Sequence, residues 1–169
     1  MKSGKESQTT NSEEQFSLLS KSLFTGFVGG IALGCAWCIL YYFNFSEISP
    51  KSYILKSWTN ANWTETWLGT LLTILAVGIL SIVTAWIYYA VFKKIYSMWM
   101  GVVYGIILWG IIFILIQPIF TNVPSITDVT LNTIISTVSL FILYGTFVGY
   151  SISYEYFDMK VQLSKRSKE

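Results

Sequence analysis

The chain has 169 residues, of which 53% are hydrophobic and only 12% are charged. Soluble domains carry about 25% charged residues, so this chain has too few charges to cover a water-facing surface, and much of its surface must face lipid. The net charge of +2, without a concentrated basic face, argues against a nucleic-acid partner, and the absence of histidine removes the commonest general base and metal ligand.

The chain begins with a polar segment over residues 1–21 that is rich in Ser, Thr and Glu. Such a segment cannot bury enough apolar surface to fold, so we expect a largely disordered tail. Within it, Ser12-Glu13-Glu14-Gln15 matches a capping box and predicts a helix that begins near Ser12 and continues into the membrane.

Four long runs without a charged residue follow, over residues 22–45, 67–92, 99–120 and 131–154. About 20 helical residues are needed to cross the hydrocarbon core of a bilayer, and each run is long enough. Four strands could not close into a barrel, and an open sheet would leave backbone groups unpaired in lipid. The predicted fold is therefore all-α: a polytopic membrane domain over 22–154 with four transmembrane helices in a bundle, followed by a charged tail over 155–169.

The distribution of basic residues predicts the orientation. All but two of the 11 Lys and Arg residues lie in the N-terminal segment, in the loop between the second and third runs, and in the C-terminal tail. These three segments share one side of a protein with an even number of spans, and only Lys51 and Lys56 lie on the other side. The positive-inside rule then places both termini in the cytoplasm. The predicted location is the cell membrane.

The first outer loop carries Pro50, Tyr53, Ile54 and Trp58 at roughly helical spacing. This spacing predicts a short helix that lies on the outer membrane interface as part of an aromatic belt. A ligand-binding lid is the alternative interpretation.

Glycines recur at every fourth position in three of the runs: Gly26, Gly30 and Gly34 in the first, Gly101 and Gly105 in the third, and Gly145 and Gly149 in the fourth. Such rows allow helix backbones to approach closely, which promotes helix association in lipid. Packing within the bundle is the favoured interpretation. The alternatives are a contact with a second copy or another membrane protein, and a hinge or gate.

Two further patterns invite a functional interpretation. Asn132, Ser136 and Ser139 share one face of the fourth run and could line a polar path, although such groups more often bond to their own or a neighbouring helix. Cys35 and Cys38 form a C-x-x-C pattern in the first run. Thiols in apolar surroundings are inert, so we interpret them as packing residues.

None of the four runs contains Asp, Glu, Lys, Arg or His. Ion-coupled pumps and proton relays depend on intramembrane ionisable groups, and an intramembrane hydrolase needs an activated nucleophile or a metal. We therefore predict a protein that is not an enzyme, with no catalytic residue, cofactor site or metal site.

Several short stretches resemble the YqhR family of small membrane proteins from spore-forming bacilli. They are Gly29-Gly30-x-x-x-Gly34, Asn44-Phe45-Ser46-Glu47 leading to Pro50, Lys93-Lys94, and Gln117-Pro118. The resemblance covers most of the chain outside the two tails. It implies a bacterial cytoplasmic membrane and supplies no activity, ligand or functional residue.

Two functional hypotheses follow. The first is a non-enzymatic membrane interaction or scaffold subunit that packs through its small-residue faces, with the lipid bilayer, a second copy or another membrane protein as partner. The second is a passive channel or transporter for a small neutral or hydrophobic solute, formed as an oligomer with the fourth run lining the path.

Overall fold

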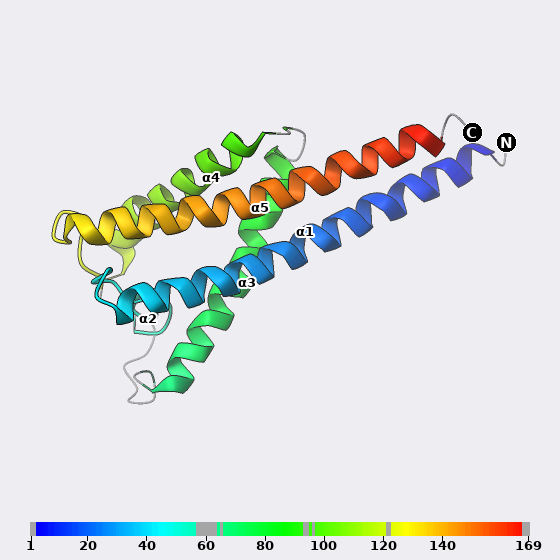
Figure 1. The fold of residues 1–169 in the computed structure, drawn as a ribbon. Coiled ribbons are helices and arrows are strands. Elements are labelled where there is room, and N and C mark those ends of the chain that lie inside the picture. Colours follow the sequence, from blue (N-terminus) through cyan, green and yellow to red (C-terminus); the bar gives the residue numbers. More distant parts are fainter. Residues whose placement is uncertain are drawn as a thin grey trace.

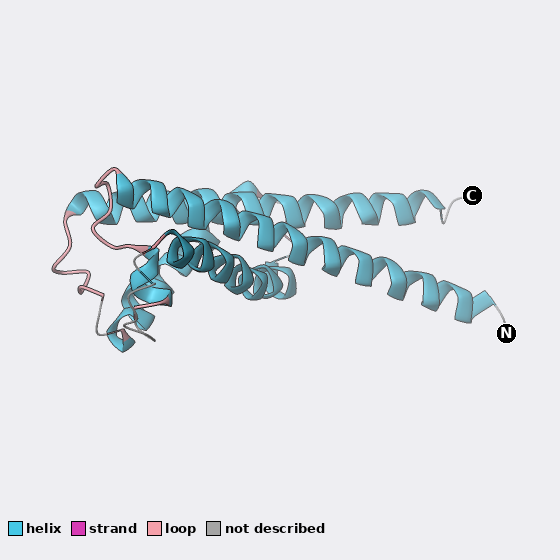
Figure 2. Ribbon diagram, turned by 90° about the horizontal axis from the view of Figure 1, so that it is seen from below, coloured by secondary structure: helices cyan, strands magenta, loops and turns pink. Residues whose placement is uncertain are grey.

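The computed structural model describes residues 3–56, 64, 66–92, 95, 97–120 and 123–166. Its regular elements, in chain order, are α1 (Ser3–Tyr42), α2 (Pro50–Ile54), α3 (Trp67–Phe92), α4 (Met98–Gly110), a π-helical segment (Ile111–Ile116), a 3-10 turn (Gln117–Ile119) and α5 (Leu131–Arg166). Figure 2 shows helices and loops throughout these described ranges and no strand.

Four helical segments are long and apolar enough to cross a membrane: Phe16–Tyr42, Trp67–Phe92, Trp99–Ile119 and Leu131–Lys165. Each overlaps one of the four predicted runs, although the fourth continues to Lys165 instead of residue 154, so the prediction of an all-helical chain with four candidate spans is confirmed.

The ends of the first span differ from the prediction. α1 already begins at Ser3, where we expected a mostly disordered tail over 1–21. Once a span is helical, each added residue gains a hydrogen bond without the cost of nucleation, so a polar flank can continue the helix. At the other end α1 stops at Tyr42 instead of residue 45, because Asn44 adopts a left-handed φ of 58°.

The hydrogen bonds around Asn44 form a Schellman motif. The Asn44 N–H donates to the Tyr41 carbonyl at 3.1 Å, and the Phe45 N–H donates to the Leu40 carbonyl at 2.9 Å. These bonds satisfy carbonyl groups that the end of the helix would otherwise leave unpaired. The chain is thereby turned toward α2.

The helices form two pairs that are joined along their longest members. α3 packs on α1, α4 packs on α5, and α1 lies beside α5. Figure 1 shows α1 and α5 running on beyond the other helices, with the N- and C-termini at the same end. α3 and α4 follow one another in the chain, yet each packs mainly on a terminal helix.

Backbone contacts hold the α4–α5 pair together at glycines. A Cβ atom built on Gly101 would lie 2.7 Å from the Gly145 carbonyl oxygen, and one built on Gly145 would lie 2.5 Å from the Gly105 nitrogen. On Gly149, a Cβ would lie 2.8 Å from the Cα of Gly101. No larger residue fits at these positions without separating the two helices.

The α1–α3 pair has a similar seam. A Cβ on Gly26 would lie 2.9 Å from the Ser81 carbonyl oxygen, one on Gly30 would lie 2.9 Å from the Cα of Gly78, and one on Gly34 would lie 3.3 Å from the Cα of Ile74. All seven glycines that the sequence singled out therefore lie at contacts between helices of one chain.

The α4–α5 seam predicts a large difference between two glycines of the same helix. In Gly105→Ala the new methyl group meets the Phe141 carbonyl and lies 2.9 Å from the Cα of Ile142, whereas in Gly110→Ala it meets nothing within 4 Å. We expect Gly105→Ala to lower the free energy of unfolding in mild detergent by about 1–3 kcal/mol. Gly110→Ala should leave it unchanged or raise it by up to about 1 kcal/mol through better helix propensity. Equal stability of the two variants would contradict the close seam.

Candidate functional site: an apolar cavity between α3 and α4

Because α3 and α4 pack on different partners, a cavity of about 560 Å³ remains between them. α1 and α5 form its floor with Leu33, Trp37, Phe141 and Tyr144. The two side walls are formed by the following residues of α3, α4 and the π-helical segment: Ala76, Val77, Ile79, Leu80, Ser81, Thr84, Leu108, Ile112 and Ile116. The lining contains no charged side chain among the described residues.

The end of the cavity nearest α2, called the outer end, is covered by this helix, and the opposite end is called the inner end. Ser49 caps this helix by accepting a bond from the Lys51 N–H at 3.2 Å, and Pro50 occupies its first turn. The Trp37 indole donates to the Ile48 carbonyl at 2.9 Å, which ties the segment before α2 to α1. Pro50, Tyr53 and Ile54 then face the cavity.

The predicted short helix is present as α2, and Tyr53 shows that one of its aromatic side chains packs into the bundle. Its side chain is only 7% exposed, and its ring lies 5.9 Å from Trp37, 5.6 Å from Phe113 and 5.4 Å from Phe120. Aromatic pairs at such distances stabilise beyond their buried area, and this cluster draws α2 into the bundle. Trp58, the other aromatic residue of the predicted stripe, lies outside the described residues.

The Tyr53 hydroxyl is buried without a hydrogen-bond partner among the described residues. Burial raises the pKa of Tyr53 because the phenolate would lose its solvation. The side chain therefore stays neutral at physiological pH, and its ring rather than its hydroxyl group fixes α2.

The inner end of the cavity is closed by hydroxyl groups that satisfy one another. Thr84 and Tyr144 are hydrogen-bonded at 2.6 Å, and Tyr104 donates to the Thr84 carbonyl at 2.5 Å. Directly below, the ring of Tyr88 lies 5.0 Å from that of Tyr104, and its hydroxyl is 3.3 Å from that of Ser153. We did not predict this closure from the sequence, although Thr84 and Tyr88 stand one helical turn apart on α3.

The wall on the α4 side is a π-helical segment rather than a regular helix. Ile112 and Ile116 of this segment line the cavity, and Phe113 turns away into the core, where it stacks on Trp109 with centroids 5.4 Å apart. π-helical turns are rare and often mark functional sites. In this segment the neighbouring residues Ile112 and Phe113 have different surroundings, since Ile112 lines the cavity and Phe113 lies in the core.

The cavity opens sideways. Ile79 and Leu80 line it and are nevertheless 60% and 58% exposed, so they form its rim on the α3 side. In a bilayer this rim faces the acyl chains.

The polar face predicted on the fourth run lies elsewhere. Asn132 and Ser139 are exposed, Ser136 is partly exposed, and none of them lines the cavity. In this part of the helix the buried polar residues are Thr133 and Thr137, which accept bonds of 3.0 Å from the Glu47 N–H and the Trp109 indole, respectively. Asn132, Ser136 and Ser139 therefore do not line this cavity, and their role in a path between the copies of an oligomer stays a prediction.

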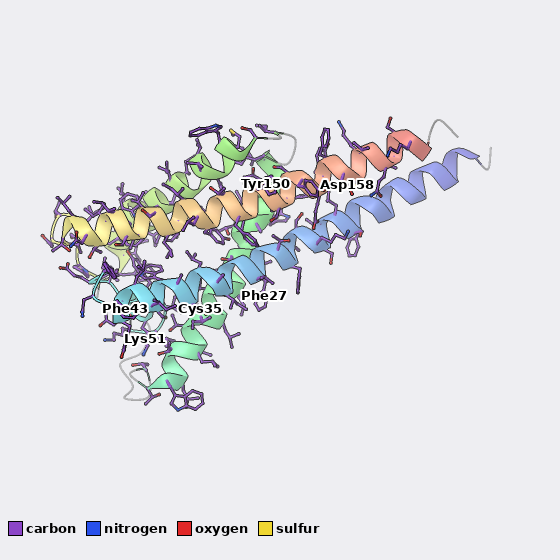
Figure 3. All side chains as sticks on the ribbon, viewed as in Figure 1. Phe27, Cys35, Phe43, Lys51, Tyr150 and Asp158 are labelled. Carbon is purple, nitrogen blue, oxygen red and sulfur yellow. The ribbon has the colours of Figure 1, made fainter. Side chains whose placement is uncertain are left out.

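Cys35 is exposed and Cys38 is half-buried on α1, and both are free thiols (Figure 3 labels Cys35). Among the described residues no group of three His, Cys, Asp or Glu side chains could hold a metal ion.

Four long apolar helices, joined as two glycine-packed pairs, define a polytopic α-helical membrane protein. The family model described as conserved membrane protein YqhR matches residues 2–167, and the chain belongs to this family. Over 151 residues the chain is 39% identical to the "Uncharacterized protein YqhR" of Bacillus subtilis (strain 168). The matched region covers 89% of this chain and 84% of that protein. No solved structure matches. The resemblance drawn from the sequence motifs is confirmed.

Two substitutions at Tyr53 separate the role of its ring from that of its hydroxyl. We expect Tyr53→Phe to keep or raise the free energy of unfolding, because a buried hydroxyl without a partner costs about 1–3 kcal/mol. Tyr53→Ala removes the ring and should lower that free energy by about 3–5 kcal/mol. Thermal or denaturant unfolding in mild detergent measures both. A marked loss of stability in Tyr53→Phe would mean that the hydroxyl group has a partner.

Proposed function

We propose that this protein is a non-enzymatic membrane interaction protein that binds an apolar partner from the bilayer through the side opening between α3 and α4. We further propose that it resides in a bacterial cell membrane with both termini in the cytoplasm. The single observation that carries the proposal is the cavity of about 560 Å³, which is apolar, opens sideways and is closed at both ends.

The chemistry of the lining favours binding over catalysis. Ser81 and Thr84 are the aliphatic hydroxyls of the cavity, and the described lining offers neither of them a histidine, lysine or carboxylate as a base. The Thr84 hydroxyl is already bonded to Tyr144 and to the Ser81 carbonyl at 2.9 Å. Ser81 packs against Gly30 in the α1–α3 seam.

The position of the glycines changes the basis of the interaction hypothesis. Packing within the bundle was the favoured interpretation of the small-residue faces and a partner contact the alternative, and other helices of the same chain occupy these faces. The cavity replaces them as the surface for a partner. A passive path through this cavity has less support, because the hydrogen-bonded hydroxyls of Thr84 and Tyr144 lie at its inner end.

Site-specific photocrosslinking in native membranes tests the proposal. When the protein is extracted from these membranes and washed in mild detergent before irradiation, a photoreactive residue at Leu80, on the rim, should still yield a discrete adduct. The same residue at Leu115, which then faces detergent, should yield none. Leu115 is a matched control because it is a leucine, is 71% exposed and does not line the cavity. The same spread of products at both positions would mean that the rim is an ordinary lipid-facing surface, and the proposed binding site would be lost.

The proposed orientation is tested by cysteine labelling. Cys35 and Cys38 are first replaced by Ala. Single cysteines at Lys5, Lys93 and Lys165 should then react with a membrane-impermeant thiol reagent only after the cells are opened. Cysteines at Lys56 and Thr127 should react with an impermeant reagent on intact cells, because basic residues are retained on the cytoplasmic side. Labelling of Lys5 in intact cells would reverse the orientation.

A further inference from the structure

The cavity between α3 and α4 offers no support for water. A buried water needs two to four polar partners. The described lining contains few polar groups. Thr84 and Tyr144 are bonded to each other, and the unpartnered Tyr53 hydroxyl would give a water molecule one partner only. Water inside would therefore face hydrocarbon on almost every side.

An empty cavity is also unfavourable in a bilayer. Lining atoms without neighbours forfeit dispersion contacts, and the rim at Ile79 and Leu80 is open to the surrounding acyl chains. The substance that can enter sideways and restore these contacts is hydrocarbon.

The volume distinguishes between two apolar occupants. A helix with a diameter of about 10 Å and a pitch of 5.4 Å occupies roughly 400 Å³ per turn. A cavity of about 560 Å³ could therefore hold little more than one turn, whereas a partner's spanning helix has several. The volume lies instead in the usual range for small ligands, about 300–1,000 Å³.

We infer that the cavity holds one acyl chain of a phospholipid from the leaflet on the α2 side. This inference rests on the proposed function and names the partner. The cavity extends from α2, at one end of the bundle, to Thr84, beyond the midpoint of α3, so the leaflet that reaches it is the one next to α2. The chain enters between α3 and α4, lies along Val77, Leu108 and Ile112, and ends at the hydroxyl-closed inner end.

The test uses proteoliposomes that contain a phosphatidylglycerol with a diazirine on one acyl chain. Val77 and Leu108 are buried in the protein and line the cavity, so surrounding lipid does not reach them. After irradiation, mass spectrometry of peptides should find adducts on both residues as well as on the exposed Leu115.

Filling the cavity should remove only the internal adducts. Ala76→Trp places an indole inside, and Ala90→Trp makes the same change at an exposed position of α3 outside the cavity. We expect adducts on Val77 and Leu108 to fall about tenfold in Ala76→Trp, equivalent to about 1.4 kcal/mol of binding. They should remain in Ala90→Trp, and adducts on Leu115 should remain in both. Ile112→Trp repeats the test from the opposite wall, and each variant is compared only if it elutes and melts as a folded protein.

The outcomes separate the two proposals. Wild-type protein without adducts on Val77 and Leu108, or adducts that persist in both filled variants, would overturn the acyl-chain inference. If the photoreactive residue at Leu80 then still captures a discrete partner, such as an isoprenoid or a protein, the proposed function stands with another occupant. If it captures none, both proposals fall.

Discussion

The approach of helix backbones at glycines determines how this bundle is put together. In lipid there is no hydrophobic drive between helices, so their association depends on close packing and on hydrogen bonds. Gly101, Gly105 and Gly145 bring α4 against α5 with backbone atoms in contact, and Gly26 and Gly30 do the same for α1 and α3. Because both seams involve a terminal helix, the two helices in the middle of the chain are left apart.

The separation of α3 and α4 accounts for the cavity, and polar contacts at its two ends preserve it. At the outer end the Trp37–Ile48 hydrogen bond and the ring of Tyr53 hold α2 over the opening. At the inner end Thr84 and Tyr144 bond across the floor. Between these ends the walls are hydrocarbon. A site with polar contacts at its ends and an apolar middle matches an apolar molecule, and the part of its lining that the structure describes contains no charged side chain.

The same architecture brings the two ends of the chain together. α1 and α5 continue as helices beyond the bundle, and Ser17 and Lys21 of α1 face Glu155 and Asp158 of α5 across a small polar pocket of about 170 Å³ (Figure 3 labels Asp158). The Gln162 amide donates to the Asp158 carboxylate at 2.8 Å. Parts of the two polar segments that the composition treats as separate therefore lie next to each other at this pocket.

The sequence by itself determined the secondary structure and the membrane character of this protein. Uncharged runs of sufficient length leave the backbone no alternative to helices in lipid, so the span 67–92 could be predicted to the residue. The rows at Gly26, Gly30 and Gly145 identified which helix faces allow close contact, because only a missing side chain permits it. Only the tertiary structure decided which faces meet. It packed the Tyr53 ring into the core, turned Asn132 and Ser139 outward, and created the cavity between α3 and α4. These features depend on helix partners and crossing directions, which arise from contacts between residues far apart in the chain and leave no local pattern in the sequence.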